Sequence, residues 1–322
     1  MKEVTISSSE QNQRVDKYLR KYLKNAPLSF IYKLLRKKDV KVNGKRIKED
    51  YILQENDFMQ IYIRDEDYDN FMNNRSFTNY KIDFKVVYED ENILIVNKPV
   101  GLEVQEDDKN NLTSQVLTYL KNKGEYNEDE NVGFKPAPAH RLDRNTSGLV
   151  IFGKNMLALQ ELNECFKSRK GIEKYYLALV FGNTKSKETL SFPLHKIENK
   201  SIVKVDFENG QNARTEYKKV WNNSEVSLLE VHLLTGRTHQ IRVHMSYIGH
   251  PLVGDEKYGN FDQNKQFKAK FNYRYQFLHA YKIIFRNLTG KLSYLNDKIV
   301  IGELPEDKNV ILNKLNCEKS TL

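Results

Sequence analysis

The eleven residues from His140 to Val150, HRLDRNTSGLV, constrain this chain more than any other segment, because they place one carboxylate between two arginines. Positive charge on both sides of Asp143 favours its ionised form. The apolar run that begins at Leu149 predicts a buried strand directly after the polar segment. Such a carboxylate is either a reactive group or half of a structural ion pair in a tight turn, and the spacing alone does not decide between them.

The segment resembles the HRLDxxTSG signature of the RluA/RluC/RluD family of pseudouridine synthases, which isomerise uridine to pseudouridine in RNA. Two later blocks resemble family motifs in the same order, at residues 174–180 (KYYLALV) and 235–244 (TGRTHQIRVH). Residues 98–102 (KPVGL) resemble a further block, although its usual Val-His-Pro continuation is replaced here by VQE at 104–106. The resemblance extends from about residue 85 to 305 and implies the shared pseudouridine synthase fold.

The resemblance also implies site residues. Asp143 is expected to be the catalytic residue, Tyr175 the aromatic ring that stacks on the target base, and Arg242 the active-site arginine that pairs with Asp143. From the residues alone, Tyr175 sits in a strand pattern that fits the core, and Arg237 is an equally good partner for Asp143. We expect Arg141, Arg144, Arg237 and His239 to contact RNA.

Composition fits an RNA-binding enzyme. The 322 residues are 30% charged and 39% hydrophobic, which is enough for one large domain and a smaller one. The formal net charge of +9 attracts polyanions such as RNA. Two cysteines, Cys165 and Cys317, indicate neither a disulfide framework nor a zinc site. The absence of a signal-like or 18-residue apolar stretch leads us to expect a cytoplasmic protein.

Residues 1–64 are predicted to form a separate RNA-binding domain. Apolar residues at helical spacing predict two short helices, and Asn43-Gly44 predicts a hairpin turn between strands. This order resembles the S4 domain. Basic residues gather towards the end of the second helix and are expected to bind RNA, unless they only form a solvated face: Lys33, Arg36, Lys37 and Lys38.

The rest of the chain divides by composition. Residues 65–80 are polar and are predicted to be a flexible linker that tethers the first domain. Residues 81–311 are predicted to be the catalytic domain and 312–322 a tail. Strand patterns at 86–98, 174–181 and 227–231 favour an α+β fold with a mixed, mainly antiparallel sheet. The acidic stretch 121–135 is predicted to be an exposed insertion without an assigned function.

We expect no cofactor, because the isomerisation conserves every atom, and no metal, because His239 and His244 are five residues apart and do not share a helix face. The chain most resembles the RluC-type branch, which implies 23S large-subunit ribosomal RNA as partner. We also expect a monomeric enzyme. Three alternatives stay open. They are a synthase for transfer RNA, a silent RNA-binding or ribosome-assembly factor, and a glycosidase that uses Glu103 or Asp255 as a second acid.

Overall fold

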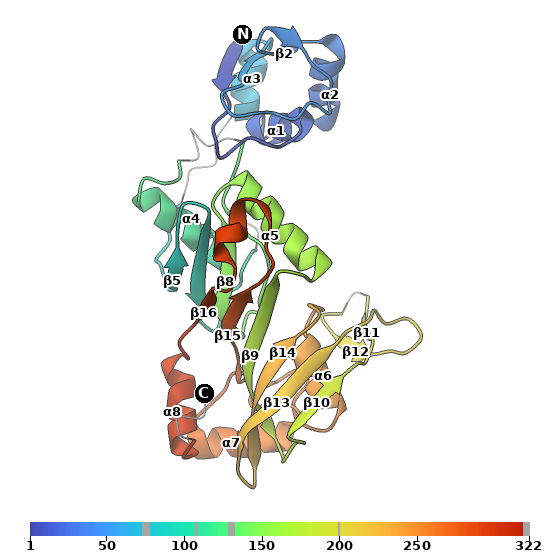
Figure 1. Cartoon of the computed structure of the whole chain (residues 1–322), viewed down its shortest axis with the longest axis vertical. Helices are drawn as coiled ribbons and strands as arrows, with labels where there is room; N and C mark the ends of the chain where they lie inside the picture. The colour runs from blue at the N-terminus through green and yellow to red at the C-terminus, as the bar shows by residue number, and fades with distance from the viewer. Residues whose placement is uncertain (73–77, 107–108, 128–132, 199, 318–322) are drawn as a thin grey trace.

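The N-terminal unit is a four-stranded antiparallel sheet with helices packed on it (Figure 1). The computed structural model describes residues 1–72, 78–106, 109–127, 133–198 and 200–317. Asn43 and Gly44 both have positive φ, 50° and 73°, as the predicted tight turn requires. In sheet order the strands are β1 (Lys2–Thr5), β4 (Phe58–Ile61), β2 (Val40–Val42) and β3 (Lys45–Arg46), and the helices are α1 (Val15–Tyr22) and α2 (Leu28–Lys37).

One apolar core holds this unit together. Buried residues of both helices, such as Leu19 and Ile31, pack against Val42 and Met59 on one face of the sheet. A third helix, α3 (Asp65–Met72), packs Tyr68, Phe71 and Met72 against the same core. The first half of the predicted linker 65–80 is therefore helical. The helix forms because its three apolar residues are spaced three and four apart and its first turn is acidic, which favours the start of a helix. The prediction missed it because so few apolar residues stand in a polar segment.

The second unit is built on a ten-stranded sheet that is mainly antiparallel, as predicted. Among the strand pairs of the described residues in this sheet, β15–β8 alone is parallel. The strand order is β10 (Lys187–Leu190), β13 (Thr215–Asn222), β14 (Val226–Leu233), β9 (Ile172–Phe181), β15 (Leu278–Phe285), β8 (Ser147–Gly153), β6 (Ile93–Lys98) and β5 (Lys85–Glu89). In addition, β16 (Ile299–Ile301) pairs with β15, β7 (Ala137–Pro138) pairs with β8, and β11 (Leu194–Lys196) forms a separate hairpin with β12 (Val203–Val205).

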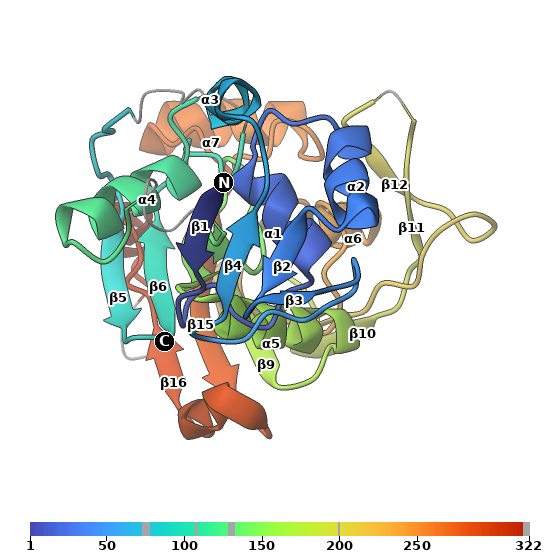
Figure 2. The same cartoon turned by 90° about the horizontal axis from the view of Figure 1, so that it is seen from above.

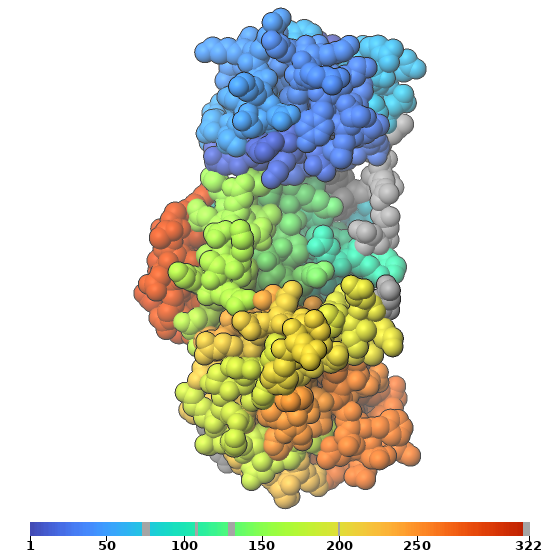
Figure 3. Space-filling model, turned by 90° about the vertical axis from the view of Figure 1, so that its right-hand side faces the viewer, coloured from blue at the N-terminus to red at the C-terminus, as the bar shows by residue number. Residues whose placement is uncertain are grey.

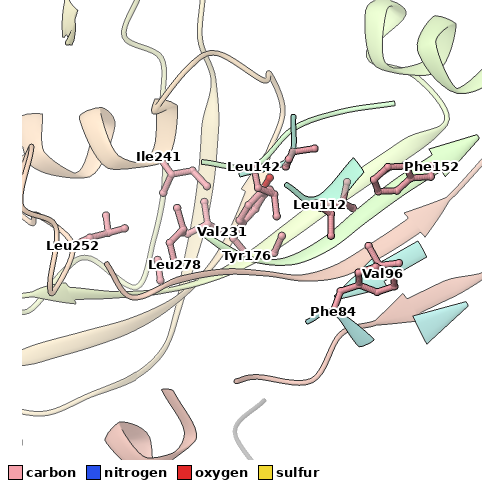
Figure 4. Packing of buried hydrophobic residues seen from close by; sticks show 14 of the residues in the cluster. Phe84, Val96, Leu112, Leu142, Phe152, Tyr176, Val231, Ile241, Leu252 and Leu278 are labelled. Atoms are coloured by element: carbon pink, nitrogen blue, oxygen red, sulfur yellow. The ribbon is translucent and has the colours of Figure 1, made fainter. Parts of the chain in front are cut away.

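Helices cover both faces of this sheet. One face packs against α4 (Leu112–Asn122) and α6 (Gln240–Tyr247), and Figure 4 shows part of that core, including Leu142, Tyr176 and Ile241. The other face packs at one end against α5 (Met156–Ser168) and η1 (Gly290–Leu295), and at the other end against α7 (Phe261–Phe271) and α8 (Glu306–Lys314). Because side chains alternate along each strand, neighbouring residues of β9 belong to different cores.

The N-terminal unit is docked on the catalytic unit, where the sequence predicts a flexible tether. Figure 3 shows the two in contact. The backbone N–H of Met156, at the start of α5, donates to the Ser9 carbonyl at 3.1 Å. The Gly133 N–H donates to the buried Glu10 carboxylate at 2.6 Å, and Gln13 donates to the Gly133 carbonyl at 3.1 Å. These bonds fix the orientation of the first domain on the catalytic domain. The first domain is therefore not held by a flexible tether alone, as the sequence predicted.

Two further boundaries differ from the predictions. The insertion at 121–135 is not simply exposed, because Tyr126 and Phe134 are buried and Gly133 joins the interface; residues 128–132 of it lie outside the described residues. The tail predicted from 312 onwards continues α8 and buries Leu312, Leu315 and Cys317, while residues 318–322 lie outside the described part. Both segments are apolar only at isolated positions, so composition alone does not reveal their burial.

Candidate active site

Asp143 lies in the loop between β7 and β8, and β8 lies between β15 and β6 in the large sheet. Its carbonyl accepts the N–H of Thr146 at 3.0 Å, and the Thr146 hydroxyl accepts from Gln276 at 2.7 Å. Gly148 has φ +121°, and a Cβ there would lie 2.3 Å from the Ala280 carbonyl oxygen in β15. The TSG residues therefore form a turn that only glycine can complete, and this turn fixes the loop carrying Asp143.

Ser147 anchors the same turn through a buried histidine. The Ser147 hydroxyl lies 2.9 Å from His279 Nδ1, and His279 Nε2 lies 3.2 Å from the Gly302 carbonyl. A carbonyl only accepts, so Nε2 carries the proton and the serine donates to Nδ1. Burial lowers the pKa of His279 to about 3, so the ring is neutral at pH 7. Ser147 therefore serves the fold and is not placed as a nucleophile.

Lys98 anchors the Asp143 loop through hydrogen bonds to backbone carbonyls. Its fully buried Nζ donates to the carbonyls of Pro99, Leu102 and Arg144 at 2.9, 2.7 and 3.0 Å. Burial lowers the pKa of Lys98 to about 7, against the opposing attraction of Asp143. The lysine thus ties the KPVGL loop to the Asp143 loop, a function that the sequence motif alone does not reveal.

Arg242 bridges two carboxylates. Its Nη1 donates to Asp143 Oδ2 at 2.9 Å, while Nε and Nη2 donate to the two oxygens of Asp255 at 2.7 and 2.9 Å. Asp255 is 1% exposed and also accepts the N–H groups of Lys257 and Tyr258. Burial favours the neutral acid, but the hydrogen bonds and charge of Arg242 outweigh it, so the pKa of Asp255 is lowered.

The structure therefore brings Asp143 and Arg242 together. Arg237, the alternative partner, instead donates to the Asn212 carbonyl at 3.2 Å. Asp255 was considered in the sequence only as a second acid for a glycosidase. Its bidentate pairing with Arg242 makes it a support for that arginine, and nothing in the local sequence signals a partner thirteen residues away.

The structure places Tyr175 away from Asp143, which corrects the prediction for this residue. Its ring stacks on His232 with centroids 4.4 Å apart, and its hydroxyl donates to Glu173 at 2.9 Å. The next residue, Tyr176, lines the cleft that contains Asp143 and packs in the same core as Leu142 (Figure 4). Burial raises the pKa of Tyr176, and the charge of Asp143 raises it further. The error arises because two tyrosines stand together on a strand whose side chains alternate between faces.

Asp143, Tyr176, His239 and Arg242 line one cleft of about 1480 Å³. His239 was predicted to contact RNA, and the three arginines predicted with it, Arg141, Arg144 and Arg237, line the cleft too. Gln105 also lines the cleft, so the segment that departs from the family pattern forms part of its wall. Five basic residues that were not predicted also border the cleft: Lys167, Arg169, Lys174, Lys257 and Arg274.

The basic residues of α2 lie outside this cleft. Lys33, Arg36, Lys37 and Lys38 are all exposed on the docked N-terminal unit. Figures 1 and 2 show α2 on the side of the molecule where the β11–β12 hairpin lies, and Ser201 of that hairpin lines the cleft. The α2 helix and this edge of the cleft therefore lie on the same side of the molecule.

No group of three or more His, Cys, Asp or Glu residues in the part of the chain that the structure describes is arranged to hold a metal ion. Within the same residues, no helix combines the length and the apolar character needed to cross a membrane.

Comparison with known proteins agrees with this geometry. Residues 92–247 match the RNA pseudouridylate synthase family, and residues 13–58 match the S4 domain. An uncharacterized RNA pseudouridine synthase of Mycoplasma capricolum is 35% identical over 94% of this chain and 97% of its own length. The ribosomal large subunit pseudouridine synthase C of Haemophilus influenzae is 35% identical over 99% and 96%, respectively.

Solved structures share the fold. Human RNA pseudouridylate synthase domain containing 4 superimposes with a TM-score of 0.57 at 22% identity, over 72% of this chain and 92% of its own. Human RNA pseudouridylate synthase domain containing 1 gives a TM-score of 0.51 at 24% identity, over 73% and 96%. The family and fold class expected from the sequence are confirmed: the chain belongs to the RNA pseudouridine synthases and carries an S4 domain ahead of the catalytic domain.

Proposed function

We propose that this enzyme isomerises uridines of large-subunit ribosomal RNA to pseudouridine, with Asp143 as the catalytic carboxylate. The observation that carries the proposal is the Asp143–Arg242 hydrogen bond of 2.9 Å inside a basic cleft, held in place by Asp255. Relatives similar over most of the chain are named for the large ribosomal subunit, which supports ribosomal RNA as the target. We expect the enzyme to act as a monomer in the cytoplasm.

The chemistry breaks the bond between ribose C1′ and uracil N1, turns the base, and joins C5 to C1′. C5 then loses its hydrogen and N1 gains one, so the atoms balance without a redox cofactor. An oxyanion beside the sugar and base assists this rearrangement, by adding to the base or ribose or by removing a ribose proton. Arg242 orients the Asp143 carboxylate in the cleft through a charge-assisted hydrogen bond.

Tyr176 takes the role that the sequence assigned to Tyr175. Its ring borders the cleft beside the Asp143 loop and offers a flat surface for the uracil. The target uridine must leave its stack to reach this surface, at a cost of a few kcal/mol that favours loops and single strands. Arg141 is exposed at the cleft and suits the space that the uridine vacates or a neighbouring phosphate.

The S4 domain supplies a second RNA contact at a fixed position. The exposed α2 cations, Lys33, Arg36, Lys37 and Lys38, are expected to neutralise phosphates, while Arg144, Arg237 and the other cleft cations hold the strand near Asp143. Because the domains are docked, RNA that spans both surfaces is presented to the cleft in one register.

The test mixes the purified enzyme separately with ribosomal and transfer RNA that carry tritium at uracil C5, and counts the label released. Bond formation at C5 expels that hydrogen. We expect release from large-subunit ribosomal RNA, and reverse-transcription mapping should place pseudouridine at defined positions in it. Release from transfer RNA alone would move the target to that class. Binding without release from either RNA would identify a silent RNA-binding protein.

A further inference from the structure

His239 has an unusual backbone at the edge of the cleft. It precedes α6 and has φ +54°, the left-handed region that residues other than glycine rarely adopt. Such conformations persist only where the surroundings hold them, and they gather at functional sites. Here the surroundings are Tyr258, which contacts the ring, and Asp143, which faces it from across the cleft.

The hydrogen bonds of Tyr258 favour one tautomer of His239. The Val203 N–H donates to the Tyr258 hydroxyl oxygen at 2.9 Å, and that oxygen lies 2.7 Å from His239 Nδ1. Among the described residues, no other acceptor lies within hydrogen-bond distance of this hydroxyl. A hydrogen bond from the Tyr258 hydroxyl to Nδ1 gives this hydroxyl both a donor and an acceptor, and it leaves the neutral ring with its own hydrogen on Nε2.

The ring is neutral at physiological pH. Burial lowers the pKa of His239; Asp143 opposes this shift, and the nearby charges of Arg242 and Lys257 add to it. Its Nε2 lies 3.8 Å from Asp143 Oδ2, too far for a hydrogen bond, and that oxygen already accepts from Arg242 at 2.9 Å. In this tautomer an N–H donor is directed into the cleft beside Asp143, and the described residues place no acceptor at hydrogen-bond distance from it.

We propose that His239 is a further catalytic residue, whose Nε2–H donates a hydrogen bond to a carbonyl oxygen of the uracil as the base leaves C1′. When that bond breaks, its electron pair stays with the base, and the negative charge spreads over N1, O2 and O4. The imidazole keeps its proton and stabilises this charge until C5 attacks C1′. A base in contact with Asp143 Oδ2 lies within reach of Nε2, because the two atoms are only 3.8 Å apart.

This inference rests on the proposed function and assigns a separate task. Asp143 acts on the sugar or base as an oxyanion, whereas His239 acts as a neutral electrophile towards the departing uracil. Removal of one such donor from a site that stabilises an oxyanion costs about 10²- to 10³-fold in rate. A residue that merely shapes the cleft would not be sensitive to the hydrogen-bonding power of one substrate oxygen.

The test combines protein variants with single-atom changes in RNA. His239→Asn suits the left-handed backbone but is too short to place a donor at Nε2, whereas His239→Gln restores an amide N–H near that position. Single-turnover tritium release is measured on RNAs whose target is uridine, 2-thiouridine or 4-thiouridine, because sulfur is a poor acceptor. RNA affinity and thermal unfolding of each variant serve as the folding controls.

We expect one thio substitution to slow the wild type, His239→Asn to be about 10²-fold slower on uridine, and the thio effect to vanish in that variant. His239→Gln should recover part of the rate and the thio effect. If both thio effects stay the same size in His239→Asn, or if that variant turns over uridine at the wild-type rate, the role of His239 is refuted while the proposed function stands. A wild type that releases no tritium from any RNA would refute both.

Discussion

Replacing Asp255 with Asn should destabilise the catalytic domain strongly. Asp255 is 1% exposed and accepts four hydrogen bonds, two of them from Arg242. The amide loses the charge and turns an NH₂ group towards a guanidinium that only donates. Breaking a buried ion pair by removing one partner costs about 3–5 kcal/mol. Arg242 retains Asp143, which favours the lower end of that range.

The loss is measurable through the single tryptophan. Trp221 lies in β13 and packs against the core of the catalytic domain, so its fluorescence reports that domain and not the S4 unit. A loss of about 3 kcal/mol corresponds to a fall in Tm of roughly 6–12 °C for a domain of this size. Asp262→Asn, at an exposed carboxylate on α7, is the matched control and should shift Tm little.

The pH dependence gives a second check. The folded pKa of Asp255 lies below its ordinary value of 3.8, so the carboxylate contributes stability that is fully present above that value. This stability is lost as the pH falls through the folded pKa. The gap between wild type and Asp255→Asn should therefore hold from pH 8 to 5 and narrow below about pH 4. A gap under about 1 kcal/mol at pH 7, or one that persists undiminished at pH 3, would refute this reasoning.

Three further predictions concern the site and the RNA surface. Tyr176→Leu should slow single turnover about tenfold to a hundredfold through lost stacking, whereas Tyr175→Leu should not; equal losses would return the stacking role to an open question. Lys37→Ala should weaken RNA binding and reduce its salt dependence by about one counterion at an unchanged single-turnover rate, and a slower chemical step would contradict that division. Gly148→Ala should prevent stable folding of the catalytic domain, as thermal unfolding would show, because its Cβ meets β15 backbone; a native Tm would contradict the close packing.

The motifs contain residues that the structure brings together. The HRLDxxTSG segment located Asp143, and the TGRTHQIRVH segment located Arg242, which the structure places 2.9 Å apart although 99 residues separate them. An aspartate between two arginines is a local pattern, which the sequence displays directly. Strand patterns also predicted the antiparallel sheet, because alternation and β-branched runs are local signals.

Other features depend on tertiary contacts that no local pattern displays. β9 is buried on both faces over much of its length, so hydrophobic alternation could not tell Tyr175 from Tyr176. The burial of Asp255 depends on the chain from 252 to 258, which folds back on α6. Docking of the S4 domain depends on the backbone of Gly133, which carries no side chain to signal an interface.

The central claim is that the Asp143 carboxylate performs the reaction, and single-turnover release of C5 tritium by Asp143→Asn tests it most directly. The amide keeps the size of the side chain and removes only its charge, so fold and RNA affinity should stay near those of the wild type. We predict that the wild type releases tritium from large-subunit ribosomal RNA and that Asp143→Asn, bound to the same RNA, releases none. Substantial release by a clean preparation of Asp143→Asn would contradict the claim and remove Asp143 from the chemistry.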